Sequence, residues 1–114
     1  MYDLVWCEEP ESVRKGTVAM DDSEAWLRTG STWLVEAFRV MNELDMCGWG
    51  MENKFWNQDG DWVEPDEIEE ALEAYRASGK RGDDLFEEPR AAERWDKWIE
   101  FLEGAAEHEG FRCY

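Results

Sequence analysis

Residues 89–114 read PRAAERWDKWIEFLEGAAEHEGFRCY, a run that predicts a long helix followed by a short strand. Pro89 suits the first turn of a helix, and Gly110 suits the residue that ends one. Between them, apolar side chains recur three and four residues apart, as on a helix with one buried face: Ala92, Trp95, Trp98, Ile99, Leu102, Ala105 and Ala106. Residues 111–114 form the predicted strand.

The beginning of the chain predicts the partner of this strand. In residues 2–7 the large apolar side chains of Tyr2, Leu4 and Trp6 alternate with other residues, which is the period of a strand. The run ends at Pro10 and the glutamates around it. Two short strands at the edges of a small domain need each other's hydrogen bonds, so we expect the N-terminal and C-terminal strands to pair.

Two further helices are predicted in the middle of the chain. Residues 32–45 have an apolar stripe made of Leu34, Ala37, Phe38, Met41 and Leu44. A second helix begins at Pro65 and ends near Gly79, and its stripe is Ile68, Ala71, Leu72 and Tyr75.

Four shorter segments carry local signals. Residues 16–20 are read as a second short strand, and residues 21–23 offer N-caps for a short helix carrying Trp26 and Leu27. The turn signal Asp59-Gly60 favours a hairpin between 54–57 and 61–63, and 80–88 is read as a loop. The expected fold is one α+β domain, residues 1–114, in which three to four helices pack on a small antiparallel sheet with paired terminal strands.

The charge of the chain limits its partners. Of the 114 residues, 29 are acidic and 12 basic, giving a net charge of −17, while 43% are hydrophobic, which argues against disorder. Such a surface repels nucleic acid and anionic membranes and attracts basic proteins. A need for solubility alone, or adaptation to high salt, would also account for the acidity. Without a long apolar run or a secretory leader, we expect the protein in the cytosol.

Catalytic and metal-binding patterns are weak. His108 is the single histidine, and no serine-elbow or phosphate-binding motif is present. His108 with Cys7, Cys47 and Cys113 gives a zinc set by count, but close cysteine pairs are missing. Asn57, Asp59 and Asp61 begin like a calcium loop, which then fails at Trp62 and Ile68. We therefore predict no catalysis, no cofactor and no bound metal.

Acidic residues gather on one predicted helix face. Asp66, Glu69, Glu70 and Glu73 lie three or four residues apart, opposite the apolar stripe of the helix that begins at Pro65. Asp83 and Asp84 start a second acidic run, which Glu87 and Glu88 continue. A rigid row of carboxylates resembles a phosphate backbone in charge, so it can occupy a basic nucleic-acid-binding groove. The alternative is an ordinary solvated helix face.

Seven of the eight tryptophans divide into two predicted groups, and the eighth, Trp6, lies in the predicted N-terminal strand. Trp26, Trp33, Trp95 and Trp98 lie on or beside helical stripes and are expected in the core. Trp49, Trp56 and Trp62 fall in a glycine-rich segment and are expected to be partly exposed. Exposed tryptophan beside acid is typical of binding hot spots, so these three are predicted anchors for a partner protein.

Both ends of the chain resemble a known group of proteins. Tyr2-Asp3-Leu4-Val5-Trp6 at the start, and residues 105–114 at the end, are similar to small acidic bacterial proteins of the toxin-immunity type. That resemblance implies an N-terminal strand and a final helix followed by a strand. Size and acidity also look like phage-encoded antagonists of host defence, including DNA-mimic anti-CRISPR proteins, for which the host cytosol is the expected location.

The sequence thus leads to one preferred function and three alternatives. The preferred function is a non-enzymatic inhibitor that docks acidic helix faces and tryptophan anchors onto a basic nucleic-acid-binding or nuclease effector. The alternatives are an immunity protein that neutralises a toxin, a halophilic structural domain and a small metal-binding domain.

Overall fold

The two ends of the chain form the centre of the sheet. A computed structural model describes residues 1–46, 48–56 and 60–114. Its four strands are β1 (Tyr2–Trp6), β2 (Trp26–Thr29), β3 (Trp62–Val63) and β4 (Phe111–Cys113), all antiparallel in the order β2-β1-β4-β3. The predicted α+β class and the pairing of the terminal strands are therefore confirmed.

The register of β1 follows from its alternating sequence. Leu4 is buried between Leu27 of β2 and Cys113 of β4, and the next residue, Val5, lies between Trp26 and Arg112. Beyond β4 the ladder continues, because the N–H of Asp3 donates to the Tyr114 carbonyl at 2.9 Å and the Asp3 carbonyl accepts a 2.8 Å bond in return. One face of the sheet is thus apolar and buried, and the other, which carries Val5, Trp26 and Arg112, is mixed in character and less buried.

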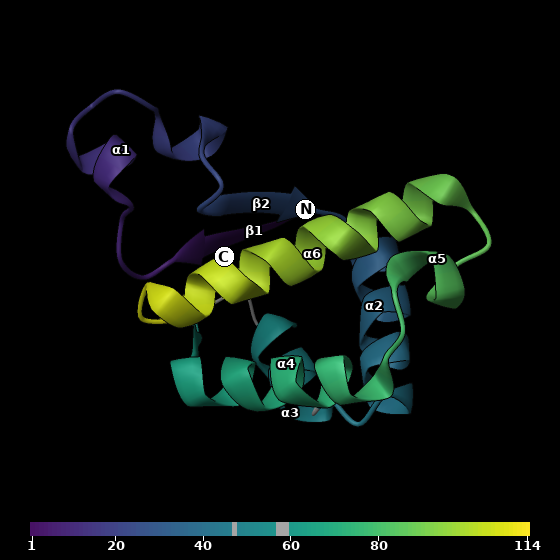
Figure 1. Cartoon of the computed structure of the whole chain (residues 1–114). Helices are drawn as coiled ribbons and strands as arrows, with labels where there is room; N and C mark the ends of the chain where they lie inside the picture. The colour runs from purple at the N-terminus through teal and green to yellow at the C-terminus, as the bar shows by residue number, and fades with distance from the viewer. Residues whose placement is uncertain (47, 57–59) are drawn as a thin grey trace.

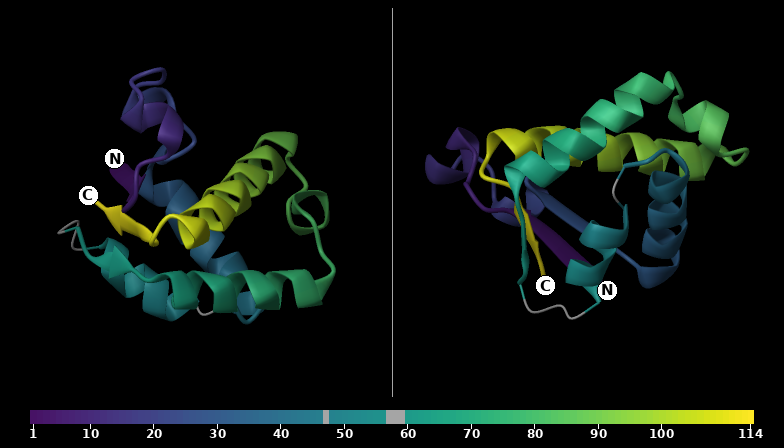
Figure 2. Two further views of the ribbon diagram at one scale, coloured as in Figure 1. Left: turned by 60° about the vertical axis from the view of Figure 1, so that its left-hand side comes forward. Right: turned by 90° about the horizontal axis from the view of Figure 1, so that it is seen from below.

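The longer helices lie on the apolar side of the sheet (Figure 1). In chain order the helices are α1 (Glu11–Arg14), α2 (Ser31–Glu43), α3 (Gly48–Phe55), α4 (Pro65–Ser78), α5 (Gly82–Leu85) and α6 (Pro89–Glu107), with a 3₁₀ turn η1 at Met20–Asp22. Figure 1 shows α6 running along the sheet with α4 below it, and both views of Figure 2 keep α4 beside α6. The three long predicted helices are confirmed as α2, α4 and α6.

Aromatic rings fill the space between the sheet and the helices. Trp95 and Trp98 of α6 are fully buried, as predicted, and the Trp98 ring contacts Phe55 of α3 and Phe111 of β4. The ring of Phe38 in α2 packs edge to face against that of Phe55, with the ring centroids 4.9 Å apart. These contacts connect α2, α3 and α6 to β4 in one core, as expected of a single domain.

Glycine is required at one junction beside the sheet. Gly110 has φ +81°, and a Cβ there would collide with the Val63 carbonyl of β3. The chain therefore turns from α6 into β4 at a residue that combines a left-handed backbone with close approach to the neighbouring strand. Gly79, at φ +68°, caps the C-terminus of α4 as predicted.

Two predicted elements in the first third of the chain are wrong. Residues 16–20 form no strand, and the second strand is β2, in the segment predicted as a helix carrying Trp26 and Leu27. Pairing with β1 explains this difference, because the strand hydrogen bonds come from residues distant in sequence. Trp26 consequently stands on the outer face of the sheet and is only partly buried, as is Trp33 at the start of α2, so neither is a full core residue.

The predicted hairpin is also wrong. Residues 48–55 form α3, although Gly48 and Gly50 suggested an irregular segment, and β3 pairs with β4 instead of with residues 54–57. Met51 and Phe55 lie four residues apart on α3 and are fully buried, so packing stabilises the helix despite its glycines. Residues 57–59 lie outside the described part of the chain. The predicted loop 80–88 contains the short helix α5.

Candidate functional site: an acidic helical surface

The predicted acidic face lies on the outside of α4. Asp66, Glu69, Glu70 and Glu73 are all exposed, while Ile68, Ala71 and Leu72 face the core. Pro65 begins the helix, and the acidic residues of the first turn lie near the positive end of its dipole. Among the described residues, none of these four carboxylates has an ion-pair partner within 4.0 Å.

Glu67 has a different role from its acidic neighbours. Its Oε2 lies 2.7 Å from Lys54 Nζ, and both side chains are mostly shielded from solvent. The same ammonium donates to the Trp62 carbonyl at 2.8 Å. Lys54 therefore connects α3 to β3 and to the first turn of α4, which holds the start of the acidic helix in place.

A second acidic row lies along α6. Its members are spaced three, four, three and four residues apart, and all are exposed: Glu93, Asp96, Glu100, Glu103 and Glu107. At a rise of 1.5 Å per residue the row is about 21 Å long. This row was not predicted, because the prediction for this helix rested on its apolar stripe alone. The same spacing, applied to Asp and Glu, would have found it.

The two acidic rows belong to neighbouring helices. α4 packs against α6, and Arg76 of α4 lies 3.8 Å from Glu103 of α6, between the exposed faces of the two helices. Lys97 lies 3.8 Å from Glu93. In the described part of the chain, Arg76 and Lys97 are the cations paired with the two rows. The other seven of the nine carboxylates have no ion pair there. We call the nine residues the acidic surface: Asp66, Glu69, Glu70, Glu73, Glu93, Asp96, Glu100, Glu103 and Glu107.

Two of the predicted tryptophan anchors, Trp56 and Trp62, are partly exposed but separate. Trp56 is 38% exposed, contacts Tyr2 and Phe38, and donates to Glu52 Oε1 at 3.2 Å. Trp62 is 39% exposed on β3, and its indole N–H donates to the Glu109 carbonyl at 2.8 Å. No ring contact joins the two within the described chain. Trp49 is part of α3, and its side chain lies outside the described part of the structure.

Asp83 and Asp84 lie at the far end of α4 from Trp62. Both are exposed on α5, which follows the C-terminus of α4. Asp84 Oδ2 accepts a hydrogen bond from the Arg81 backbone at 2.9 Å, so this carboxylate holds the start of α5. The predicted site residues therefore do not form one cluster: Trp62 lies just before the N-terminus of α4, and Asp83 and Asp84 lie beyond its C-terminus.

Cys7 and Cys113 have environments that suppress thiolate formation. Cys113 of β4 is buried, and that burial raises its thiol pKa to about 11. Cys7 is an exposed residue, yet the partial burial of its thiol also raises the thiol pKa. Cys47 lies outside the described residues. Within residues 1–46, 48–56 and 60–114, no three His, Cys, Asp or Glu side chains are grouped as metal ligands.

Comparison with known proteins adds no relative. No protein-family model, curated protein or solved structure matches this chain significantly. Among the described helices, none has the length and apolar composition needed to cross a membrane.

Proposed function

We propose that this protein is a non-enzymatic inhibitor that binds a basic nucleic-acid-binding protein or nuclease through its acidic surface. The observation that carries the proposal is the unpaired state of most carboxylates on two adjacent helices. Like charges three or four residues apart on a helix cost a few tenths of a kcal/mol per pair, so these rows weaken the isolated fold slightly. A basic partner would turn that repulsion into attraction on binding.

The geometry of the rows fits a groove that normally holds a phosphate backbone. α6 carries five carboxylates over about 21 Å, and α4 adds four beside them. Both helices are fixed to the core by buried side chains, so the backbone that carries the charges needs no ordering on binding. Trp62, next to the N-terminus of α4, is the anchor nearest to this surface in the chain.

Two biological settings share this chemistry. An antagonist of a defence nuclease, as in anti-CRISPR proteins that mimic DNA, and an immunity protein for a toxin nuclease would each present carboxylates to a basic groove. We place either activity in the cytosol of the host cell. The identity of the bound partner would distinguish the two settings.

The test is affinity capture from a host lysate with matched variants. One variant neutralises α4 by Asp66→Asn, Glu69→Gln, Glu70→Gln and Glu73→Gln. The control removes the same charge from exposed residues outside the acidic surface, by Glu8→Gln, Glu9→Gln, Asp21→Asn and Asp22→Asn. We expect a basic nucleic-acid-binding protein to be retained by the wild type and the control and lost by the α4 variant. Equal retention by both variants, or no retained basic protein, would contradict the proposal.

A further inference from the structure

The free edge of β2 presents unused backbone groups. The Trp6 N–H donates to the Ala25 carbonyl at 3.1 Å, which places even-numbered β1 residues in hydrogen-bonded pairs with Ala25, Leu27 and Thr29. By alternation, the backbone groups of Trp26 and Arg28 point away from β1. The Ser23 carbonyl accepts the Trp26 N–H at 3.3 Å, but no described residue outside the sheet bonds the Arg28 N–H or carbonyl. Arg28 can therefore exchange two hydrogen bonds with another strand.

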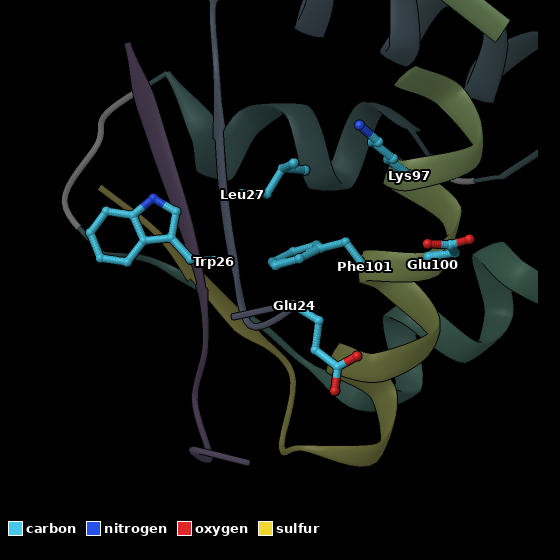
Figure 3. A pocket seen from close by; sticks show the side chains of 6 residues that line it. All are labelled: Glu24, Trp26, Leu27, Lys97, Glu100 and Phe101. Atoms are coloured by element: carbon cyan, nitrogen blue, oxygen red, sulfur yellow. The ribbon is translucent and has the colours of Figure 1, made fainter. Parts of the chain in front are cut away.

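A groove runs beside this edge, between β2 and α6. In Figure 3, Leu27 of β2 and Phe101 of α6 point toward each other across the groove, with Lys97 along its wall. The hollow continues into a cavity of about 480 Å³ that shares Leu27 and Lys97 and adds Thr29 and Trp33. An apolar floor beside an open strand edge is the arrangement that accepts an added strand in peptide recognition.

The larger cavity is opposite in charge to the molecule, whereas the part of the groove near Phe101 is also lined by Glu24 and Glu100. The charged side chains lining the larger cavity are Arg28, Arg94 and Lys97, and no carboxylate is among its lining residues. Arg94 has no ion pair with any described residue, and the Lys97–Glu93 pair is long at 3.8 Å and exposed. Arg28 is paired with Asp3 at 2.8 Å, so Arg94 and Lys97 are the cations that a ligand carboxylate in this cavity would meet.

We propose that the β2 edge binds an extended acidic segment of a partner protein, which adds as a fifth strand. Its backbone bonds to Arg28, and its carboxylates reach Arg94 and Lys97. A second copy of this chain is a poorer occupant, because pairing two β2 edges would bring the cations of both copies together. This inference uses charge opposite to that of the acidic surface, although the two regions meet at Glu100, which lines the groove near Phe101.

The test uses two capped octapeptides, one alternating valine with glutamate and one alternating valine with lysine. Fluorescence anisotropy measures binding, and amide hydrogen exchange measures protection of the Arg28 N–H. We expect saturable binding of the glutamate peptide with slower exchange at Arg28, whereas the lysine peptide, which the acidic surface can bind elsewhere, should leave exchange at Arg28 unchanged. Equal slowing of Arg28 exchange by the two peptides, or no slowing by the glutamate peptide, would overturn the proposal.

Variants separate charge from backbone pairing. The double variant Arg94→Glu, Lys97→Glu should bind the glutamate peptide at least tenfold more weakly. The control, Arg14→Glu, Lys15→Glu on and beside α1, carries the same charge change and should bind this peptide as the wild type does. Arg28→Pro removes the N–H that faces away from β1 and should abolish binding. Should this variant unfold, the α6 double variant still decides the question. Arg28 protection that rises with protein concentration without peptide would assign the edge to a second copy and overturn the inference.

Discussion

The indole ring of Trp6 occupies the space where any other residue at position 104 would place its Cβ. Trp6 belongs to β1 and Gly104 to α6, so this contact sets how closely the longest helix approaches the central strand. The indole N–H also donates to the Phe101 carbonyl at 3.1 Å, in the same helix. The position of α6, which carries five carboxylates of the acidic surface, therefore depends on a glycine.

Replacing Gly104 by alanine should destabilise the protein. In an ordinary helix the change would stabilise by about 1 kcal/mol, but here the added methyl group meets the Trp6 ring, and such overpacking costs about 1–3 kcal/mol. Gly50→Ala in α3 is the matched control, because a Cβ there meets only Glu67 Oε1 at 3.5 Å. Urea unfolding measures both variants, and a stabilised Gly104→Ala protein would show that α6 is free to move away from β1.

Trp98→Phe should cost less stability than Trp6→Phe. Both indoles are buried, but the Trp98 N–H has no hydrogen-bond acceptor among the described residues, whereas that of Trp6 is bonded. An unpaired buried donor costs about 1–3 kcal/mol, and phenylalanine removes that penalty while leaving part of the ring volume. Free energies of unfolding from urea titration would show the order, and an equal or larger loss for Trp98→Phe would contradict it.

Asp3 should contribute stability only above acidic pH. The Arg28 guanidinium, at 2.8 and 3.2 Å, lowers the pKa of this carboxyl below its usual value of 3.8. A lowered folded-state pKa gives stability that is present above 3.8 and is lost as pH falls through the folded value. The stability difference between wild type and Asp3→Asn should therefore shrink below about pH 4. In an Arg28→Gln background, the stability change caused by Asp3→Asn should depend little on pH. If it still varied with pH, a partner other than Arg28 would be responsible.

Alkylation should distinguish two of the thiols. With a pKa of about 11, Cys113 is almost fully protonated at about pH 8, and it is also buried. Cys7 is exposed, so iodoacetamide should modify Cys7 well before Cys113 in the folded protein. Peptide mass spectrometry measures both rates, with urea-unfolded protein as the control in which the two become similar. Equal rates in the folded protein would mean that β4 opens readily.

Elements with their own local signals were predictable from the sequence. Pro65, Pro89 and Gly79 marked helix boundaries, and the apolar stripes of α2, α4 and α6 gave their buried faces. Strand β2 was missed because Trp26–Thr29 becomes a strand only through pairing with β1, which no local pattern records. Helix α3 was missed because burial of Met51 and Phe55 outweighs the glycines near them.

The candidate site was predictable only in part. The α4 row was found by its charge spacing, and the equal spacing from Glu93 to Glu107 could have been found in the same way. The position of this row beside α4 depends on how the helices pack, so it could not be predicted from the sequence. The groove at β2 depends on a strand edge that the sequence analysis did not predict, so its cations, Arg94 and Lys97, showed no pattern in the sequence.

The most direct test of the proposed inhibition is competition between this protein and duplex DNA for the captured basic partner. Affinities are measured over a salt series for the wild type and for the α4 variant with four neutralised carboxylates. The account predicts mutually exclusive binding, a steep loss of affinity with salt, and a shallower salt dependence for the variant. A stable ternary complex with DNA, or a complex whose affinity does not change with salt, would contradict it.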